Sequence, residues 1–412
     1  MIDSGSTGFM IICTTFVFLM TPGLAFFYGG LVRRKNVVNT MMSSIFIMGL
    51  CSVMWILFGY SLAFGGNTGG IIGSLDFLGL NGIGMDDVTG SIPTYVWVAF
   101  QMMFALITPA LISGSVAGRM KFKAFFIFIA LWSIVVYYPL AHMVWGEGGL
   151  LGEGWLHSVD FAGGNVVHIS SGVTALVLAI LLGKRQGFER ISYRIHNIPF
   201  VVLGGALLWF GWFGFNAGSA LEANGLAAHA LLTTNTSAAA AVLVWMLIDV
   251  IKDGKPTLVG AITGGVVGLI SITPGAGFVP IWSSIIIGGC GSVICYFMVS
   301  TLKSKFKVDD ALDAFGCHGI GGIWGGIATG IFADPAINDL ASEGLIFGGT
   351  SQFVSQAVSI IITIAIAVVG SLVCIGITSL FTKLRVDEQS EKIGLDITQH
   401  GEMAYPSFNG FD

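Results

Sequence analysis

Charged side chains are scarce in this sequence of 412 residues. Only 10% of the residues are Asp, Glu, Lys or Arg, whereas hydrophobic residues make up 54%. A water-soluble domain normally carries about 25% charged residues to solvate its surface. The sequence therefore predicts a protein whose main solvent is lipid. The net charge of −5 also argues against a nucleic-acid partner, which would need a basic face.

Metal and disulfide motifs are also absent from the sequence. The six cysteines all fall inside apolar runs, and none shows the paired spacing of a zinc site or a disulfide framework. We interpret them as small hydrophobic residues buried in the membrane, and we expect no metal and no cofactor. The first residues lack the basic region of a secretory signal, so we expect the first apolar run to be retained.

Long apolar runs are abundant. A membrane-spanning helix needs about 20 mainly apolar residues, and eleven runs of that kind follow one another along the chain. They predict an all-α polytopic membrane protein with eleven transmembrane helices. Their centres are near Leu19, Met54, Ala105, Trp132, Thr174, Leu207, Ala239, Val266, Gly289, Ile323 and Ala365.

The basic residues indicate the orientation of these spans. All 18 Lys and Arg residues fall in six clusters that follow the odd-numbered spans, and the intervening loops carry acidic residues but no Lys or Arg. Because basic loops stay in the cytoplasm, the N-terminus is predicted outside and the C-terminus inside. We expect a transmembrane domain over residues 1–384 and a cytoplasmic tail over 385–412. The clusters are Arg33, Arg34, Lys35; Arg119, Lys121, Lys123; Lys184, Arg185, Arg190, Arg194; Lys252, Lys255; Lys303, Lys305, Lys307; and Lys383, Arg385, Lys392.

Two short segments of the chain have similar sequences. Residues 160–168 read DFAGGNVVH and residues 310–318 read DALDAFGCH, so an Asp precedes a His by eight residues in both. The first segment enters the fifth span from outside, and the second enters the tenth span from inside. This pattern predicts an inverted repeat of five plus five helices, an architecture common in transporters.

His168 and His318 are rare ionisable residues within predicted spans. Such residues are costly in lipid and are functional candidates by default. Their Gly- and Ser-rich neighbours let other helices approach, so we expect both imidazoles to face the interior of the bundle. The alternative is two separate core histidines, each with its own partners. A metal site is disfavoured because no carboxylate or thiolate lies at ligand spacing, and Cys317 is on another helix face.

A dry path lined by histidines suits a small neutral base. Moving a bare cation into a low-dielectric medium costs on the order of tens of kcal/mol, and a neutral base escapes most of this cost. Neutral imidazole accepts a proton on one nitrogen and donates from the other. A coupled pair could therefore handle a proton of the substrate.

Aromatic and small polar residues mark the predicted outer side. Phe104 falls in the middle of its span, whereas Trp145, Phe215 and Ser219 lie toward the outer ends of theirs. Aromatic faces attract ammonium-like cations by about 0.5–2 kcal/mol each. An interfacial aromatic belt explains a Trp at a span end equally well, so the role of Trp145 stays open at this point.

Several of these segments together resemble the ammonium transporter (Amt/Rh) family. The matching strings are DFAGGNVVH at 160–168, WFGFNAGS at 212–219 and FGCHG at 315–319, and LAFFYGGL at 24–31 resembles the first helix of the family. They occur in the family's order and extend over almost the entire chain. The resemblance implies a homotrimer with one pore per subunit, in the plasma or inner membrane.

The resemblance also implies roles for individual residues at the outer side. Trp145, Phe104 and Ser219 would form an outer ammonium site, with Phe104 and Phe215 stacked as a gate below it. Asp160 would organise this vestibule as a structural carboxylate. The stretch from Trp145 to Asp160 is longer than usual in the family, and its added Glu residues at 147 and 153 are expected to enrich cations near the mouth.

Deeper in the pore, the resemblance implies that His168 and His318 form a hydrogen-bonded pair. The residues expected near the cytoplasmic constriction are Leu24, Phe27, Tyr28 and Ala314. Ala314 is smaller than the residue usual in the family, which predicts a wider inner end.

The tail resembles the cytoplasmic segment of bacterial and archaeal members, through the string GLDITQHGEMAYP at 394–406. That resemblance implies docking under the trimer and binding of the PII signalling protein. The alternative is a solvated, frayed terminus.

Three functions follow from these features. The first is a transporter that binds ammonium, and by the resemblance also methylammonium, deprotonates it and conducts ammonia with or without the proton. The second is a sensor of the same fold that signals through its tail. The third, a membrane enzyme using the two histidines, is disfavoured because no motif such as His-Glu-x-x-His is present, and we predict no enzymatic activity.

Overall fold

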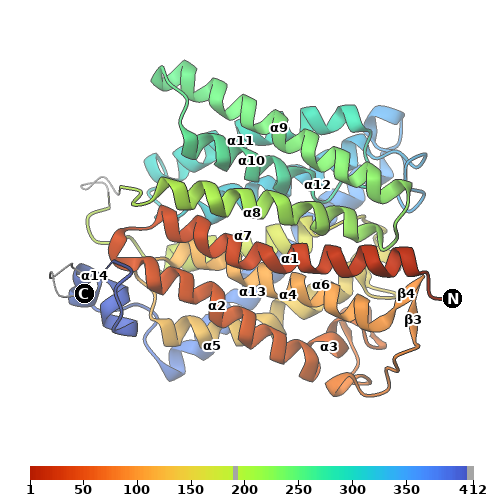
Figure 1. The fold of residues 1–412 in the computed structure, drawn as a ribbon, viewed down its shortest axis with the longest axis horizontal. Coiled ribbons are helices and arrows are strands. Elements are labelled where there is room, and N and C mark those ends of the chain that lie inside the picture. Colours follow the sequence, from red (N-terminus) through yellow and green to blue (C-terminus); the bar gives the residue numbers. More distant parts are fainter. Residues whose placement is uncertain (189–193, 406–412) are drawn as a thin grey trace.

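The structure is a computed structural model that describes residues 1–188 and 194–405. Its helices run roughly along the long axis of one bundle, and the N-terminus and α14 (Glu388–Ile393), near the end of the described chain, lie at opposite ends of that axis (Figure 1). This placement agrees with an odd number of spans. Arg190 of the third basic cluster and residues 406–412 of the predicted tail lie outside the described residues.

The bundle is built from long helices and a few short ones. The bounds of the helices are α1 Ser4–Leu31, α2 Val37–Met54, α3 Tyr60–Phe64, α4 Thr94–Val116, α5 Phe122–Trp132, α6 Tyr138–Trp145, α7 Ser170–Leu182, α8 Ile198–Ala217, α9 Gly225–Asp253, α10 Leu258–Ile272, α11 Ile281–Ser304, α12 Ile320–Phe332, α13 Ser351–Phe381 and α14 Glu388–Ile393.

Short π-helical and 3₁₀ segments interrupt or extend these helices. The π-helical segments are η2 Trp55–Gly59, η4 Ser133–Tyr137, η5 Leu150–Gly154, η6 Gly164–Ile169, η8 Phe315–Gly319 and η10 Asp396–His400. The 3₁₀ turns are η1 Arg34–Asn36, η3 Leu78–Leu80, η7 Gly218–Ala220 and η9 Leu345–Phe347. Two small antiparallel hairpins lie between α3 and α4, formed by β1 Asn67–Thr68 with β2 Ile72–Gly73, and by β3 Val88–Thr89 with β4 Ile92–Pro93.

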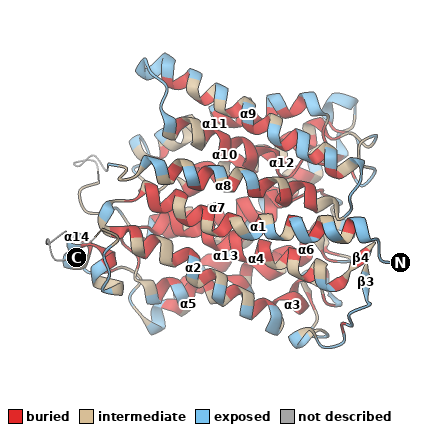
Figure 2. Cartoon of the chain, in the orientation of Figure 1, coloured by how far each residue is buried: buried red, intermediate tan, exposed pale blue. Residues whose placement is uncertain are grey.

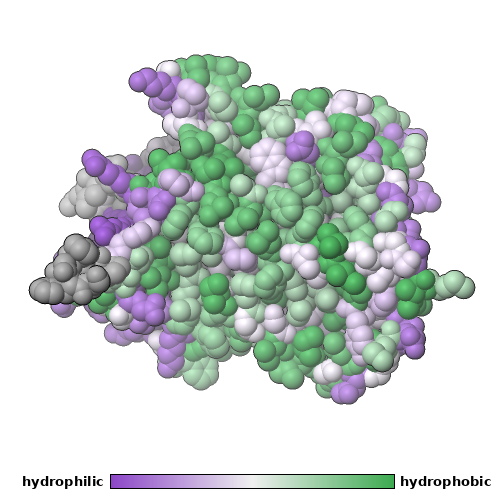
Figure 3. All heavy atoms as spheres, in the orientation of Figure 1, coloured by the Kyte–Doolittle hydropathy of each residue, from purple (hydrophilic) through white to green (hydrophobic). Residues whose placement is uncertain are grey.

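Within the described residues, nine helices are long and apolar enough to cross a membrane. The two remaining predicted spans correspond to α10, which has 15 residues, and to η8 followed by α12. On the face shown in Figure 3, apolar side chains cover the middle of the surface, and polar residues gather at its two ends. This distribution supports a polytopic membrane protein, while the count of eleven and the orientation remain predictions.

Burial follows the inner faces of the helices (Figure 2). Glycines allow some of these faces to approach closely, most clearly between α1 and α8. A Cβ atom on Gly23 would lie 2.9 Å from Cβ of Leu207, and one on Gly204 would collide with the backbone of Phe27. Close backbone approach through small residues is the usual packing mode in lipid. It brings the Leu24–Phe27 turn of α1 beside the aromatic residues of α8.

Candidate functional site

His168 and His318 meet in the centre of the bundle. Their Nδ1 atoms are 3.3 Å apart, and the two rings are nearly parallel, with centroids 5.4 Å apart and an interplanar angle of 25°. Both side chains are buried, with 1% and 4% of their surface exposed. The pair is therefore joined directly, which argues against the alternative of two separate core histidines.

Each histidine lies on a π-helical segment whose first N–H groups are bound by a buried aspartate that precedes it in the sequence. Asp160 accepts backbone N–H bonds at the start of η6 from Gly163 at 2.8 Å, Gly164 at 2.6 Å and Asn165 at 2.7 Å. Asp310 does the same at the start of η8, accepting from Ala314 at 3.1 Å, Phe315 at 2.8 Å and Gly316 at 3.3 Å. Carboxylates at this position satisfy the free N–H groups of a helix start. The similar segments 160–168 and 310–318 thus share this arrangement of an aspartate and three backbone N–H groups.

A glycine contact holds the two histidine-bearing segments together. Gly172 of α7 packs directly against the backbone of His318 and Gly319, and a Cβ at position 172 would collide with N of Gly319. Only a residue without a side chain permits this approach. The contact fixes how closely η8 lies to the helix that continues from His168.

The paired histidines line a very small cavity. Its volume is about 10 Å³, close to the space that one water molecule needs. Its walls are otherwise almost entirely apolar, as expected for a hydrophobic pore. The lining residues are Met20, Leu24, Phe27, Ile107, Leu111, Val167, His168, Leu208, Trp212, Phe215, Val266 and His318.

A stacked aromatic pair closes this cavity on its outer side. The rings of Phe104 and Phe215 are 4.2 Å apart with an interplanar angle of 21°. Trp145 meets Phe104 edge-on at 5.7 Å, and its indole N–H donates to the backbone oxygen of Asp160 at 2.8 Å. Ser219 donates its hydroxyl to the Phe215 carbonyl at 2.9 Å. The four residues expected at the outer site and the gate are thus neighbours.

An outer cavity of about 670 Å³ lies above the stacked rings. Phe104, Trp145, Asp160 and Ser219 all line it, together with residues of the longer loop such as Glu153. Both carboxylate oxygens of Asp160 are taken up by the backbone donors of η6, which agrees with the structural role expected for this residue.

An inner cavity of about 290 Å³ lies on the other side of His318. Phe27 and His318 line both this cavity and the small one, and Tyr28 lines only the inner one. Tyr28 donates its hydroxyl to the Leu111 carbonyl at 3.2 Å. Ala314 is buried at the start of η8, where its N–H binds Asp310. Of the residues expected at the inner constriction, Phe27 and Tyr28 therefore line the inner cavity, Leu24 lines only the small one, and Ala314 lines neither.

Trp212 is a residue of this site that sequence reasoning did not single out. Its ring stacks on His168 at 5.4 Å with an interplanar angle of 21°, and its N–H donates to Oγ1 of Thr273 at 2.8 Å. Its place in the site could have been predicted from its position three residues before Phe215, because this spacing places both residues on one face of α8.

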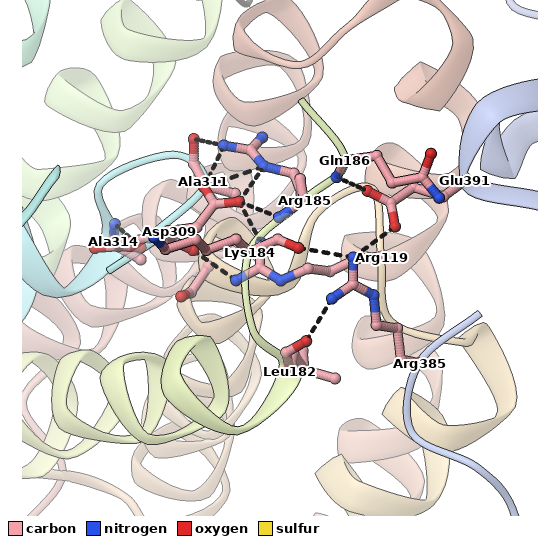
Figure 4. Close-up of polar contacts among 12 residues, drawn as sticks. Arg119, Leu182, Lys184, Arg185, Gln186, Asp309, Ala311, Ala314, Arg385 and Glu391 are labelled. Carbon is pink, nitrogen blue, oxygen red and sulfur yellow. Dashed lines mark hydrogen bonds and ion pairs between the residues drawn. The ribbon is translucent and has the colours of Figure 1, made fainter. Parts of the chain in front are cut away.

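At the end of the bundle near the C-terminus, Asp309 joins two arginines (Figure 4). Arg185 binds its carboxylate at 2.6 Å, and the buried Arg119 donates to its backbone oxygen at 2.5 Å. Burial alone would raise the pKa of Asp309, but the bonds and charges of Arg185 and Arg119 outweigh it and hold the pKa below its ordinary value. Asp309 directly precedes Asp310, which caps the segment carrying His318.

The described part of the tail docks against the same end. Glu391 of α14 accepts from the backbone N–H of Gln186 at 2.6 Å and from Arg385 at 2.7 Å (Figure 4). Further along, Asp396 accepts from the backbone N–H of Asn39 at 2.9 Å. These contacts join the tail to the loop after the fifth predicted span and to the first turn of α2, as docking requires, and they argue against a fully solvated terminus.

No group of three or more His, Cys, Asp or Glu side chains suited to a metal ion occurs in residues 1–188 and 194–405. All six cysteines are free, and Cys290 alone among them is only half-buried.

Comparison with known proteins gives one consistent family. Residues 8–405 match the model of the Ammonium Transporter Family. The chain is 52% identical to an ammonium transporter of Bacillus subtilis, over 97% of this chain and 98% of the relative. It is 44% identical to ammonium transporter Amt1 of Archaeoglobus fulgidus, over 98% of this chain and 100% of the relative.

Solved structures agree with these sequence matches. The fold is similar to Saccharomyces cerevisiae Mep2, with a TM-score of 0.90 and 36% identity, over 100% of this chain and 93% of Mep2. It is also similar to a protein described as a sensor Amt protein, with a TM-score of 0.87 and 27% identity, over 96% of this chain and 98% of that one.

Proposed function

The chain belongs to the Ammonium Transporter Family, and we propose that it recruits ammonium at the outer aromatic site, removes a proton and conducts ammonia through the twin-histidine pore. It is a multi-pass integral membrane protein of the plasma membrane. Members of such a family are transporters or channels and not enzymes.

The main support for this proposal is that three cavities follow one another along one path through the bundle. The outer cavity ends at the Phe104–Phe215 stack, the small cavity contains the paired histidines, and the inner cavity begins at His318 and Phe27. The middle section is too narrow and apolar for a hydrated cation, since a bare charge would lose most of its solvation there. It suits a neutral molecule of the size of water.

The outer site has groups that attract a cation before it reaches the narrow middle cavity. The faces of Phe104 and Trp145 supply cation–π attraction, worth about 0.5–2 kcal/mol each. The Ser219 hydroxyl donates to Phe215, which leaves its oxygen lone pairs free to accept a hydrogen bond from ammonium. These contacts favour a cation site over an aromatic belt for Trp145.

The histidine pair can accept and donate the proton that ammonium loses. Two facing Nδ1 atoms form a hydrogen bond only when one is protonated and the other is not. Each ring can therefore exchange a proton with its partner or with a substrate nitrogen. Whether the proton crosses with ammonia then depends on this pair.

The resemblance extends the proposal to partners. We propose a homotrimer with one pore per subunit, which the apolar outer surface of the bundle is suited to form within lipid. The docked tail and the basic loops beside it are suited to bind a cytoplasmic PII protein.

A sensor is the second candidate function, because the chain is also similar to a sensor Amt protein. The docked tail is the part that would signal. A sensor without transport activity would bind ammonium and change the state of its tail with no flux, so a flux assay separates the two functions.

The twin histidines provide the test of the proposed mechanism. We expect His168→Ala and His318→Ala each to abolish or alter selective ammonium transport, because each removes one half of the proton-handling pair, while assembly survives. Flux of ammonium into proteoliposomes measures this effect. The control is His229→Ala, since the ring of His229 hydrogen-bonds the backbone oxygen of Val279 and lines none of the three cavities. Normal flux and selectivity in both pore variants would overturn the mechanism.

A further inference from the structure

Gln101 is a buried polar residue to which the proposed mechanism gives no role. It lies on α4 with only 5% of its surface exposed, and it lines the outer cavity. Its side-chain oxygen Oε1 is buried and has no hydrogen-bond partner among the described residues. An unpaired buried carbonyl is costly, and most such oxygens in folded proteins have a partner. In this rotamer the oxygen is closed off from the cavity, and a half-turn about the last side-chain bond exchanges it with the amide nitrogen and presents an acceptor to a ligand that donates a hydrogen bond.

The position of Gln101 on its helix directs it to the proposed ammonium site. Trp97, Phe100, Gln101 and Phe104 line the outer cavity, and their spacing of three and four residues places them on one face of α4. Phe104 belongs to the gate and touches Trp145. Gln101 is the one residue of this face whose side chain can accept a hydrogen bond through an oxygen.

Other polar groups beside the gate are already engaged. The carboxylate of Asp160 accepts three backbone N–H bonds, and the indole N–H of Trp145 donates to the Asp160 carbonyl. Glu153 and Asp339 also line the cavity, but both are exposed at its mouth. On the faces that carry Phe104 and Phe215, Ser219 and, after rotation of its amide, Gln101 offer side-chain oxygen acceptors to the cavity.

We propose that the Gln101 carbonyl accepts a hydrogen bond from ammonium at the outer site and makes this site prefer cations that carry N–H donors. The inference rests on the proposed function, because it adds a ligand to the same site. Aromatic faces attract any compact cation, so they do not separate ammonium from a quaternary ion. An oxygen acceptor does, since the quaternary ion has no N–H group to offer it. A cation in the cavity also selects the amide rotamer that turns the oxygen toward it.

A matched pair of ligands tests this inference. Tetramethylammonium carries the same charge as ammonium but has no N–H donor, and it serves as a competitor of ammonium flux. In proteoliposomes of the full chain, Gln101→Leu should raise the apparent KM for ammonium roughly tenfold, as expected for loss of a hydrogen bond to a charged group. The inhibition constant of tetramethylammonium should stay unchanged. A merely structural role of Gln101 would weaken both ligands together.

Two further variants complete the design. Met102→Leu is the control, because Met102 is the next residue on α4 and lines none of the three cavities, so both constants should stay at wild-type values. Gln101→Glu keeps an oxygen acceptor, so ammonium affinity should be retained or improved even if the leucine variant does not assemble. Weaker ammonium binding in Gln101→Glu, or equal shifts for both ligands in Gln101→Leu, would overturn the inference and leave the proposed function intact. Wild-type protein without saturable ammonium flux would overturn the proposed function itself.

Discussion

At the outer end of the pore, backbone hydrogen bonds hold the side chains that surround the proposed cation site. Asp160 receives three backbone N–H bonds, and its own carbonyl receives the indole N–H of Trp145. The carboxylate therefore fixes the start of η6 and the position of the indole ring at the same time. In the proposed site, attraction of the cation would come from aromatic faces and neutral oxygens, which would bind ammonium without trapping it as a buried ion pair would.

Variants of Trp145 and Ser219 test whether these two side chains help to bind the cation. We expect Trp145→Leu and Ser219→Ala to raise the apparent KM for ammonium with little change in maximal flux, because both residues act before the pore. Loss of one aromatic face should cost about 0.5–2 kcal/mol of binding, and concentration-dependent flux measures it. Trp282→Leu is the control, since Trp282 is exposed and lines none of the three cavities. Unchanged concentration dependence in both site variants would assign Trp145 to the aromatic belt.

His400 makes docking of the tail depend on pH. The amide of Asn39 donates to Nε2 of His400 at 2.9 Å, which requires a neutral ring, and burial lowers the pKa of His400 below its ordinary value of 6.5. The undocked tail therefore binds a proton more readily, so docking is stable above pH 6.5 and weakens as the pH falls below it. Limited proteolysis of the tail between pH 8 and 5 measures this, and His400→Gln should flatten the dependence. Equal protection of the wild-type tail across this range would contradict it.

Sequence motifs located most site residues and included Trp212, yet they assigned no role to Trp212 or to Gln101. His168, Ser219 and His318 stand in strings that resemble a family, and the roles of Phe104 and Trp145 were implied by the same resemblance; all five residues line the outer or the small cavity. Helices buried on all sides are apolar around their whole circumference, so periodicity does not reveal which face meets the pore. That Trp212 stacks on a histidine follows only from packing of α8 against η6.

At the scale of the elements, the two segments carrying the histidines are positioned by equivalent aspartates and by one glycine contact. The strings around Asp160 and Asp310 predicted that equivalence. Their π-helical form and the approach through Gly172 were not predicted, because both depend on neighbouring helices. The two hairpins between α3 and α4 were also not predicted, since strands of two residues leave no periodic pattern.

A methyl group at Gly172 tests the importance of this contact. We expect Gly172→Ala to lower ammonium flux and to destabilise the protein by about 1–3 kcal/mol, because the new Cβ would collide with backbone atoms that cannot rotate away. Thermal unfolding of the detergent-solubilised protein, together with flux, measures both effects. Gly376→Ala is a matched control within α13, where a Cβ would meet no atom within 4 Å. A Gly172→Ala variant as stable and active as Gly376→Ala would contradict the expectation.

At the scale of the whole molecule, the loops that carry basic residues and the tail form one polar layer at one end of the bundle. Arg119 and Arg185 meet at Asp309, and Arg385 joins the layer to Glu391 (Figure 4). The alternation of basic clusters along the sequence predicted that these loops share one side. It did not predict their partners, because the acidic residues come from distant parts of the chain.

Removal of the central charge tests how much this layer contributes to stability. We expect Asp309→Asn to lower the free energy of unfolding by about 3–5 kcal/mol, because it leaves the buried Arg119 without its carboxylate partner. Asp313→Asn is the control, since its ion pair with Lys303 is partly exposed and should contribute only about 0–1 kcal/mol. Thermal unfolding in detergent compares the two variants. Equal unfolding temperatures of the two variants would show that the polar layer contributes little to the stability of the protein.

The central claim is that this chain transports ammonium through its own pore. The most direct test is an ammonium concentration jump across proteoliposomes of the purified protein, with the current and the internal pH recorded together. We predict a saturable, protein-dependent response that His168→Ala alters, either as an inward current or as internal alkalinisation without current. A response identical to that of empty vesicles in both recordings would contradict the claim.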